Sequence, residues 1–394
     1  MATGIPDAPP LVAFGRQLTG LVPLLTLVTR LRWLLCGVGA LQSCAPMLNS
    51  GVQPGDLIRF SAAGGWIVSG RLDDVYASSW MQAGPLELLA SWVLFPFGYQ
   101  HRAEYVTAGL FGQTGLRLIV GAALVAGAML LVRYLRSVHG ETPSASMELL
   151  AGLTTVLVGV PYHFWTGGHL AQTGIPLTWI LGASQIVRGR TRLGGLVIGL
   201  SAAWEPWGVL TAGVLLAERR PTRLLLGCAA LAAGALAGYL PFLASGQFAM
   251  FGLDWAILPN TLVARIFPHT DEFGWPLRLL QGTAAGLAGA VTAGVLGRRR
   301  DLIWLGPLAV LVVRLLLDPL LLSYYWEPFL IAVPIGVGLL HQGCSPVRVA
   351  LAAGVTAVPL IRFRSGLDHD LLLLSGALVL IAALMVVLRQ EEHD

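Results

Sequence analysis

Residues 110–132, LFGQTGLRLIVGAALVAGAMLLV, form the stretch that decides the fold class. About 20 mostly apolar residues are enough for one helix to cross a lipid bilayer. Similar apolar runs recur from residue 33 to residue 388, with no large polar region between them. The 394 residues are only 12% charged, whereas a soluble domain is charged at about 25% of its positions. The sequence therefore predicts an all-α, polytopic integral membrane protein.

The arginines of the short loops orient the apolar runs, because positive residues concentrate on the cytoplasmic side of a membrane. We expect a cytoplasmic segment with an interfacial helix at residues 1–29, followed by one transmembrane domain at residues 30–394. Outer loops are expected at residues 50–104 and 244–275. An apolar insert in the first loop, residues 85–98, is short for a full crossing and is interpreted as a re-entrant or interfacial helix.

About ten to twelve crossings are expected in total. Arg133 and Arg136 mark an expected cytoplasmic loop between two of them. The expected spans are residues 33–49, 110–132, 147–163, 170–187, 224–243, 277–297, 302–322, 328–341, 349–361 and 371–388.

Residues 194–218 do not fit a single span, because both flanks are basic and so both ends are expected in the cytoplasm. Twenty-five residues cannot cross a bilayer twice at full length. The middle holds Trp204-Glu205-Pro206-Trp207. We expect two short half-spans that meet at this break. Such irregular backbone at membrane depth is tolerated where it lines a cavity or is buried in protein.

Several function classes lack their sequence signals. The net charge of +4 is spread over short loops, so no nucleic-acid surface is expected. There is no phosphate-binding P-loop, no dinucleotide fingerprint and no serine nucleophile elbow. No cofactor is indicated, although the need for a divalent metal stays open, and the four cysteines have no metal-ligand spacing. Any chemistry must therefore be built from loops and helix ends.

The first outer loop carries the most informative polar stretch, GDLIRFSAAGGWIVSGRLDDVYASSWMQAGP at residues 55–85. Asp56 is either a helix cap or a general base at the membrane face. The pair Asp73-Asp74 is either a solvated turn after Gly70 or a set of oxygen ligands for a divalent metal.

Further candidate residues lie in later segments. Glu205 is an acid in an apolar stretch, and ionisable residues at membrane depth indicate function by default. Tyr325, Trp326 and Glu327 are either an interfacial belt with a helix cap or a sugar-binding surface. His163 and His169 are also candidates, but their spacing does not fit a zinc pair. Arg314 lies four residues before Asp318 within one expected span, and it is either the ion-pair partner of Asp318 or a contact for a lipid phosphate. Arg362 and Arg364, expected on the outer side, are further phosphate candidates.

Short elements of this loop occur in a fixed order, namely Gly55-Asp56, Phe60, Gly70, Val75-Tyr76 and Gly84-Pro85-Leu86. Their order resembles the first-loop signature of bacterial type C glycosyltransferases, in particular the actinobacterial polyprenyl-phosphomannose-dependent α-mannosyltransferases. That group includes the enzyme that extends phosphatidylinositol mannosides. Gly167-Gly168-His169-Leu170, Leu193 to Arg220 and Ser323-Tyr324-Tyr325-Trp326-Glu327 resemble later motifs of the family, over residues 30–345. Glu205 stands where the family usually has Lys, and Glu327 where it often has His.

The resemblance implies transfer of a sugar, mannose in that family, from a polyprenyl-phosphate donor to a lipid or glycan acceptor at the outer face of a bacterial plasma membrane. Asp56 is then the expected base, and Arg59, Arg364 and Arg314 are the candidates for the leaving phosphate. Substrate contacts are expected from the following residues: Arg59, Asp73, Asp74, Tyr76, His163, His169, Glu205, Tyr325, Trp326 and Glu327.

Two other functions stay open at this point. In a transporter or flippase for a lipid or small polar solute, Glu205 and Arg314 are coupling charges. In an inactive scaffold of a glycosyltransferase complex, neither Asp56 nor Glu205 affects the product.

Overall fold

The computed structural model describes residues 23–24, 26–48, 55–94, 113–157, 159–161, 168–297 and 304–320, with single residues at 322, 325, 328 and 336. This part of the chain is mostly helical. The spans expected at residues 349–361 and 371–388, and most of that at 328–341, lie outside the described residues.

Three described helices are long and apolar enough to cross a membrane: residues Leu118–Val138 of α7 (Gln113–Val138), α12 (Pro221–Ser245) and α14 (Trp275–Leu296). Only 17% of the most apolar window of α12 is buried inside the protein. Leu225 and Leu240 on α12 are 69% and 62% exposed. A continuous exposed apolar surface of this kind is stable in lipid and costly in water. The helices are therefore those of an all-α membrane protein.

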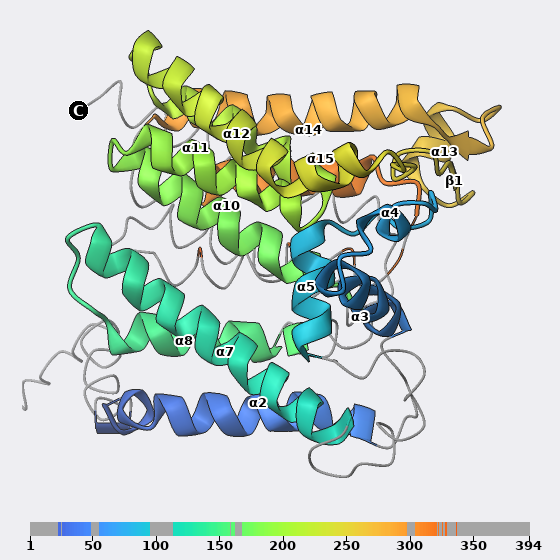
Figure 1. Cartoon of the computed structure of the whole chain (residues 1–394). Coiled ribbons are helices and arrows are strands. Elements are labelled where there is room, and N and C mark those ends of the chain that lie inside the picture. The colour runs from blue at the N-terminus through green and yellow to red at the C-terminus, as the bar shows by residue number, and fades with distance from the viewer. Residues whose placement is uncertain are drawn as a thin grey trace, which may run out of the picture.

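The remaining helices are shorter and pack between these spans (Figure 1). α10 (Ala171–Val187), α11 (Thr191–Leu200) and α15 (Leu305–Leu316) pack with α12 and α14 in one group. α2 (Arg32–Leu48) and α8 (Ala145–Leu157) pack with α7 in a second group. Trp179 on α10 and Trp304, just before α15, are fully buried in the larger apolar core. This core lies mainly in the first group and extends to the second through Val132 and Leu135 on α7 and Ala151 on α8.

The expected break near Glu205 is present. α11 continues into the 3₁₀ turn η3 (Ser201–Ala203), the chain becomes extended at Glu205, and η4 (Pro206–Ala217) begins with proline. The Gly208 carbonyl accepts hydrogen bonds from Ser201 Oγ at 2.6 Å and from Trp179 Nε1 at 2.6 Å. Polar backbone freed by the break is thus satisfied inside the protein, as membrane depth requires.

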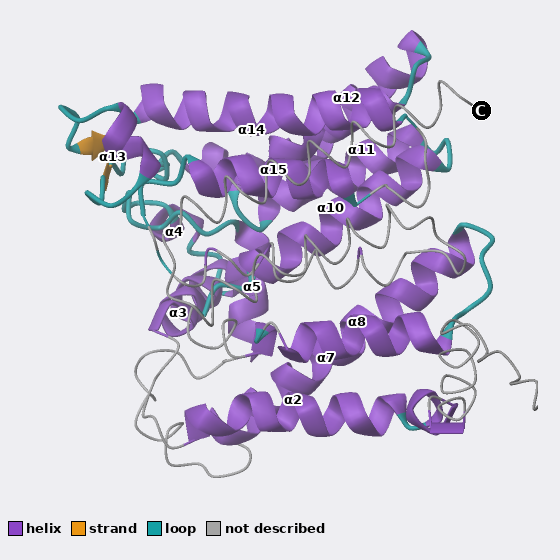
Figure 2. Cartoon of the chain, turned by 180° about the vertical axis from the view of Figure 1, so that it is seen from behind, coloured by secondary structure: helices purple, strands orange, loops and turns teal. Residues whose placement is uncertain are grey.

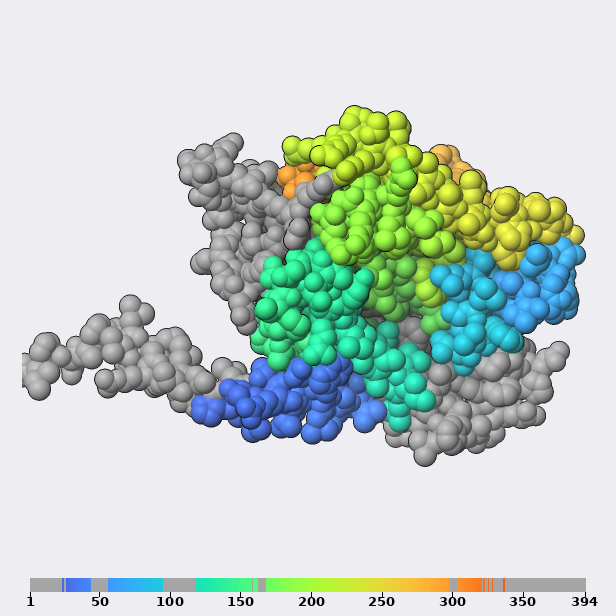
Figure 3. Space-filling model, turned by 60° about the vertical axis from the view of Figure 1, so that its left-hand side comes forward, coloured from blue at the N-terminus to red at the C-terminus, as the bar shows by residue number. Residues whose placement is uncertain are grey.

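The two segments that the sequence predicts as outer loops, called the outer-loop segments after that expectation, gather at one end of the helices, as both cartoon views show (Figure 1, Figure 2). The first consists of α3 (Gly55–Val68), α4 (Leu72–Val75) and α5 (Pro85–Leu94). The second contains α13 (Leu262–Ile266) and an antiparallel pair of strands, β1 (Trp255–Ala256) and β2 (Glu272–Phe273), which the sequence analysis did not predict. The Ala249 amide donates to the Tyr76 carbonyl at 2.8 Å, and Figure 3 shows the two segments in contact.

Two local expectations were wrong. Arg133 and Arg136 do not lie in a loop, because α7 continues to Val138 and both belong to its last turns. Glu148 on α8 is buried and binds Arg133 at 3.0 Å and Arg32 at 2.8 Å. This buried carboxylate neutralises two arginines and stabilises the packing of α2, α7 and α8.

The second wrong expectation is that Arg314 and Asp318 lie one turn apart in one helical span. α15 ends at Leu316, so Asp318 lies beyond the helix. Asp318 precedes Pro319, and a residue before proline disfavours the helical conformation. The Asp318 carboxylate instead accepts from the Leu320 amide at 3.0 Å.

Candidate active site

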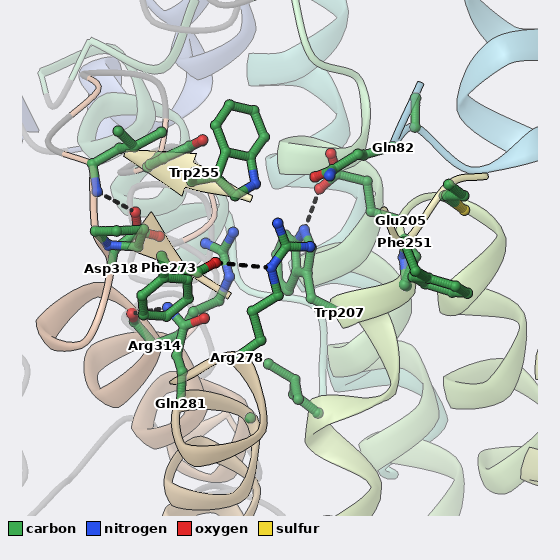
Figure 4. Close-up of a pocket in the computed structure, with 18 of the residues that line it drawn as sticks. Gln82, Glu205, Trp207, Phe251, Trp255, Phe273, Arg278, Gln281, Arg314 and Asp318 are labelled. Carbon is green, nitrogen blue, oxygen red and sulfur yellow. Dashed lines mark hydrogen bonds between the residues drawn. The ribbon is translucent and has the colours of Figure 1, made fainter. Parts of the chain in front are cut away.

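A cavity of about 710 Å³ lies between the outer-loop segments and the helices (Figure 4). α3, the break after η3, η4, α14 and the chain after α15 all contribute to its wall. Aromatic and aliphatic side chains supply most of the lining, with a few converging charged groups. This combination is typical of a ligand site. The charged lining residues are Asp56, Arg59, His169, Glu205, Arg278, Arg314 and Asp318.

Acidic groups gather on one wall around His169. Asp56, in the first turn of α3, has its Oδ2 atom 3.0 Å from His169 Nε2. The other ring nitrogen, Nδ1, is 3.8 Å from Glu87 Oε1 and 3.9 Å from Glu205 Oε1. The Phe60 ring contacts the imidazole edge-on at a centroid distance of 5.0 Å and so restrains its orientation. Three carboxylates from three separate segments therefore surround one histidine.

Glu87 is the most deeply buried member of this acidic wall, with no exposed surface. Its Oε1 atom accepts from the Ala171 amide at 3.1 Å, at the beginning of α10. Burial raises the pKa of the Glu87 carboxyl well above its ordinary value, and the nearby Glu205 and Asp56 raise it further. A carboxylate placed here is costly unless a proton or a cation accompanies it.

Glu205 is held at the break by two donors. Its Oε2 atom accepts from Trp207 Nε1 in a short hydrogen bond and from Gln172 Nε2 at 3.4 Å. Its Oε1 atom faces His169. Figure 4 draws this hydrogen bond between Glu205 and Trp207 as a dashed line between two residues that line the cavity.

Another wall of the cavity holds two guanidinium groups, those of Arg314 and Arg278, together with the buried carboxyl of Asp318, which interacts electrostatically with Arg314. We call it the basic wall, because its two arginines outnumber its one carboxyl. The Arg314 guanidinium lies over the Trp207 ring at 4.1 Å from its centroid and is 5.6 Å from that of Tyr325. Arg314 is buried, and its Nη1 atom has no hydrogen-bond partner among the described residues. Arg278 on α14 donates to the backbone carbonyls of Phe273 and Leu253. Two guanidinium groups therefore border the space that faces the acidic wall.

The structure brings six predicted site residues to one cavity, namely Asp56, Arg59, His169, Glu205, Arg314 and Tyr325. Arg59 is exposed and lies over the Trp80 ring at 5.0 Å.

Three predicted residues lie elsewhere. Asp73 is exposed, and Asp74 forms an exposed ion pair with Arg71. Tyr76 is buried in an aromatic cluster, and its hydroxyl donates to the Ala83 carbonyl at 3.0 Å. His163, Trp326, Glu327 and Arg364 lie outside the described residues.

Sequence reasoning missed four residues of the site, namely Glu87, Gln172, Trp207 and Arg278. Glu87 carries the same signal that identified Glu205, an acid inside an apolar run, but the hydrophobicity of residues 85–98 hid it. Arg278 falls near the start of the expected span at residues 277–297, and no sequence signal gave it a role of its own. No sequence signal connects Gln172 or Trp207 to Glu205.

Comparisons of the chain with protein-family models and with curated proteins find no match.

Proposed function

We propose that the chain is a membrane glycosyltransferase that moves a sugar from a polyprenyl-phosphate donor to a lipid or glycan acceptor. The observation that carries the proposal is the division of one cavity into an acidic wall at Asp56 and a basic wall at Arg314. Inverting sugar transfer needs both: a base beside the acceptor hydroxyl and positive charge beside the leaving phosphate. The resemblance in the first loop favours mannose as the sugar.

Asp56 is the proposed base. Its Oδ2 atom is bonded to His169, and its Oδ1 atom makes no hydrogen bond with a described residue and is available to an acceptor hydroxyl. In the reaction, the acceptor oxygen bonds to the anomeric carbon as the bond from that carbon to the phosphate oxygen breaks. The hydroxyl proton passes to Asp56, and polyprenyl phosphate leaves with the bonding electrons.

Arg314 is the leading candidate for the leaving phosphate, ahead of the exposed Arg59. An Arg fork matches two phosphate oxygens, and the Nη1 atom of Arg314 has no other hydrogen-bond partner among the described residues. Arg278 lies on the same wall. The aromatic rings of the lining, Trp207 and Trp255 among them, offer faces for a sugar, and apolar residues such as Leu279 suit the start of a lipid tail.

The outer side of a bacterial plasma membrane is the proposed location of the cavity. Arginines lie at the other end of the helices, with Arg32 beginning α2, Arg136 in the last turn of α7, Arg188 after α10 and Arg220 before α12. Figure 1 and Figure 2 show these helix ends away from α3, α4 and α13. By the positive-inside rule, the arginine end is cytoplasmic and the cavity faces outward.

The test is transfer by purified protein in lipid, given radiolabelled polyprenyl-phosphomannose and an actinobacterial lipid extract. Wild type is expected to move label into a new lipid, and Asp56→Asn to lose at least about 100-fold of the rate. Asp74→Asn is the matched control, because Asp74 is a carboxylate of the same loop that lies outside the cavity.

Transfer by both the wild type and Asp56→Asn at equal rates would remove Asp56 as the base. If no protein transfers label from any lipid-linked sugar, while Glu205→Gln abolishes solute or lipid movement across vesicles, the chain is a transporter and the proposal fails.

A further inference from the structure

A second feature of the acidic wall is not explained by sugar transfer alone: the arrangement of Glu87, His169 and Glu205. One potential ligand atom from each lies within 4.8 Å of the others. The three residues come from α5, from the turn before α10 and from the break before η4. Because these segments are far apart in sequence, their convergence is produced by the tertiary fold.

The two ring nitrogens of His169 have different surroundings. An ionised Asp56 can only accept, so the bond of 3.0 Å to Asp56 puts a proton on Nε2. In the neutral ring, Nδ1 then carries a lone pair, and it faces carboxylate oxygens at 3.8 and 3.9 Å. A lone pair opposite two carboxylates is repulsive unless positive charge lies between them.

The carboxylates are already held in place by other groups. The Ala171 amide orients Glu87, and Trp207 and Gln172 orient Glu205. The Glu87 Oε2 atom is buried and has no hydrogen-bond partner among the described residues. Asp56 bonded to the far side of the imidazole is the arrangement found around metal-bound histidines, where a carboxylate fixes the ring.

We propose that Glu87, His169 Nδ1 and Glu205 bind one divalent transition-metal ion, Mn²⁺ or Zn²⁺. An imidazole with carboxylates suits these ions better than Mg²⁺ or Ca²⁺, which prefer oxygen ligands alone. Tetrahedral ligation at about 2.1 Å places ligand atoms roughly 3.4 Å apart. The two separations from His169 Nδ1 are 3.8 and 3.9 Å, and all three ligand atoms lie within 4.8 Å of one another, so binding requires the carboxylates to move toward the ion.

The proposed ion lies at the wall of the cavity. Glu205 and His169 line the cavity and Glu87 lies behind them, so coordination positions beyond these three ligands face the cavity. Such open positions take a phosphate or hydroxyl oxygen of a substrate. This role rests on the proposed function, but metal binding itself does not.

The experiment measures metal binding without any sugar donor. Protein purified in detergent is stripped with EDTA, desalted and titrated with Mn²⁺, and free Mn²⁺ is followed by electron paramagnetic resonance. Bound Mn²⁺ and Zn²⁺ are counted by elemental analysis after dialysis. One ion per chain is expected. Glu87→Gln and Glu205→Gln are expected to weaken binding at least about 10-fold, and Asp56→Asn by about 10- to 100-fold.

Glu272→Gln is the matched control, because Glu272 is an exposed carboxylate at the same end of the molecule. If Glu87→Gln is not monodisperse, Glu205→Asp takes its place. It keeps the negative charge and shortens the side chain, so weaker metal binding by a monodisperse Glu205→Asp variant shows lost ligation and not misfolding. Binding below one-tenth of an ion per chain, or binding that all the variants retain, overturns the proposal. Metal binding by a protein that transfers no sugar supports the metal site and not the transferase.

Discussion

Two buried glutamates of this protein have opposite surroundings. Glu148, at the arginine end of the helices, is 1% exposed and binds Arg32 and Arg133 at 2.8 and 3.0 Å. Glu87, at the cavity end, has no exposed surface, and the nearest charged groups are Glu205, Asp56 and His169. One carboxylate is neutralised by its neighbours, and the other lies among like charges.

The difference indicates what each glutamate contributes. A buried carboxylate paired with two arginines stabilises a helix junction, and its charge is already neutralised and so does not attract a ligand. A buried carboxylate among other carboxylates lowers the stability of the empty protein. Such an arrangement is found where binding or catalysis needs it. We therefore expect the cavity end to be the functional end of the molecule.

The largest expected effect comes from the basic wall. Arg314→Gln is expected to lower the transfer rate by about 100- to 1000-fold, the usual cost of removing a donor that stabilises developing charge. Arg314→Lys keeps the charge and loses the fork, so an intermediate rate is expected. The measurement is the initial rate of label transfer at saturating donor.

Arg133→Gln is the control, since Arg133 belongs to the Glu148 cluster at the other end. If Arg133→Gln slows transfer as much as Arg314→Gln does, the two ends are not functionally distinct.

A stability experiment compares the glutamates directly. Glu148→Gln leaves Arg32 and Arg133 without their counter-ion, and a loss of about 1–3 kcal/mol in the free energy of unfolding is expected. Glu87→Gln replaces a carboxyl that is costly to ionise at this position with a neutral amide, whose oxygen can still accept from the Ala171 amide. In metal-free protein its stability is expected to equal or exceed that of wild type. Unfolding in detergent with EDTA measures both.

The outcome that contradicts this reading is a Glu87→Gln variant as unstable as Glu148→Gln. The electrostatic repulsion at the cavity end is then already relieved, by a proton held on Glu87.

Sequence alone located part of this architecture. Basic flanks on both sides of residues 194–218 predicted the break at Glu205, because a run too short to cross twice must turn back. The apolar length of residues 170–187 predicted α10 to within a residue.

Sequence could not show which polar residues meet. Glu87 and Ala171 are 84 residues apart, and no period or motif connects them. Tyr76 and Asp74 illustrate the converse, because they share a loop with Asp56 and lie outside the cavity. Membership of a loop does not determine which way a short helix such as α4 directs its side chains.

Gly84 contacts the break from the first outer-loop segment. Substituting it is expected to have a smaller effect than the substitution of Arg314. Its amide donates to the Trp204 carbonyl at 2.7 Å, and a Cβ atom there would overlap the Ala203 carbonyl oxygen. Gly84→Ala is expected to displace the backbone beside Glu205 and to lower the free energy of unfolding by about 1–3 kcal/mol.

Gly127→Ala is the control for Gly84→Ala, because a Cβ atom at Gly127 on α7 meets nothing within 4 Å. That helical substitution is expected to be neutral or slightly stabilising. If thermal unfolding shows the same loss of stability for Gly84→Ala and Gly127→Ala, the close approach of Gly84 to Ala203 does not limit the size of the side chain at position 84.

The smallest expected effect is at Trp207, which links the two walls. Its Nε1 atom donates to Glu205, and its ring lies under the Arg314 guanidinium. Trp207→Phe keeps a ring for Arg314 and removes one hydrogen bond, so a loss of about 1 kcal/mol, or roughly 5-fold in transfer rate, is expected. Trp207→Leu removes both contacts and should be slower. If the Phe and Leu variants are equally slow, the bond to Glu205 accounts for the effect. If Phe transfers at the wild-type rate and Leu does not, Trp207 acts through the basic wall alone.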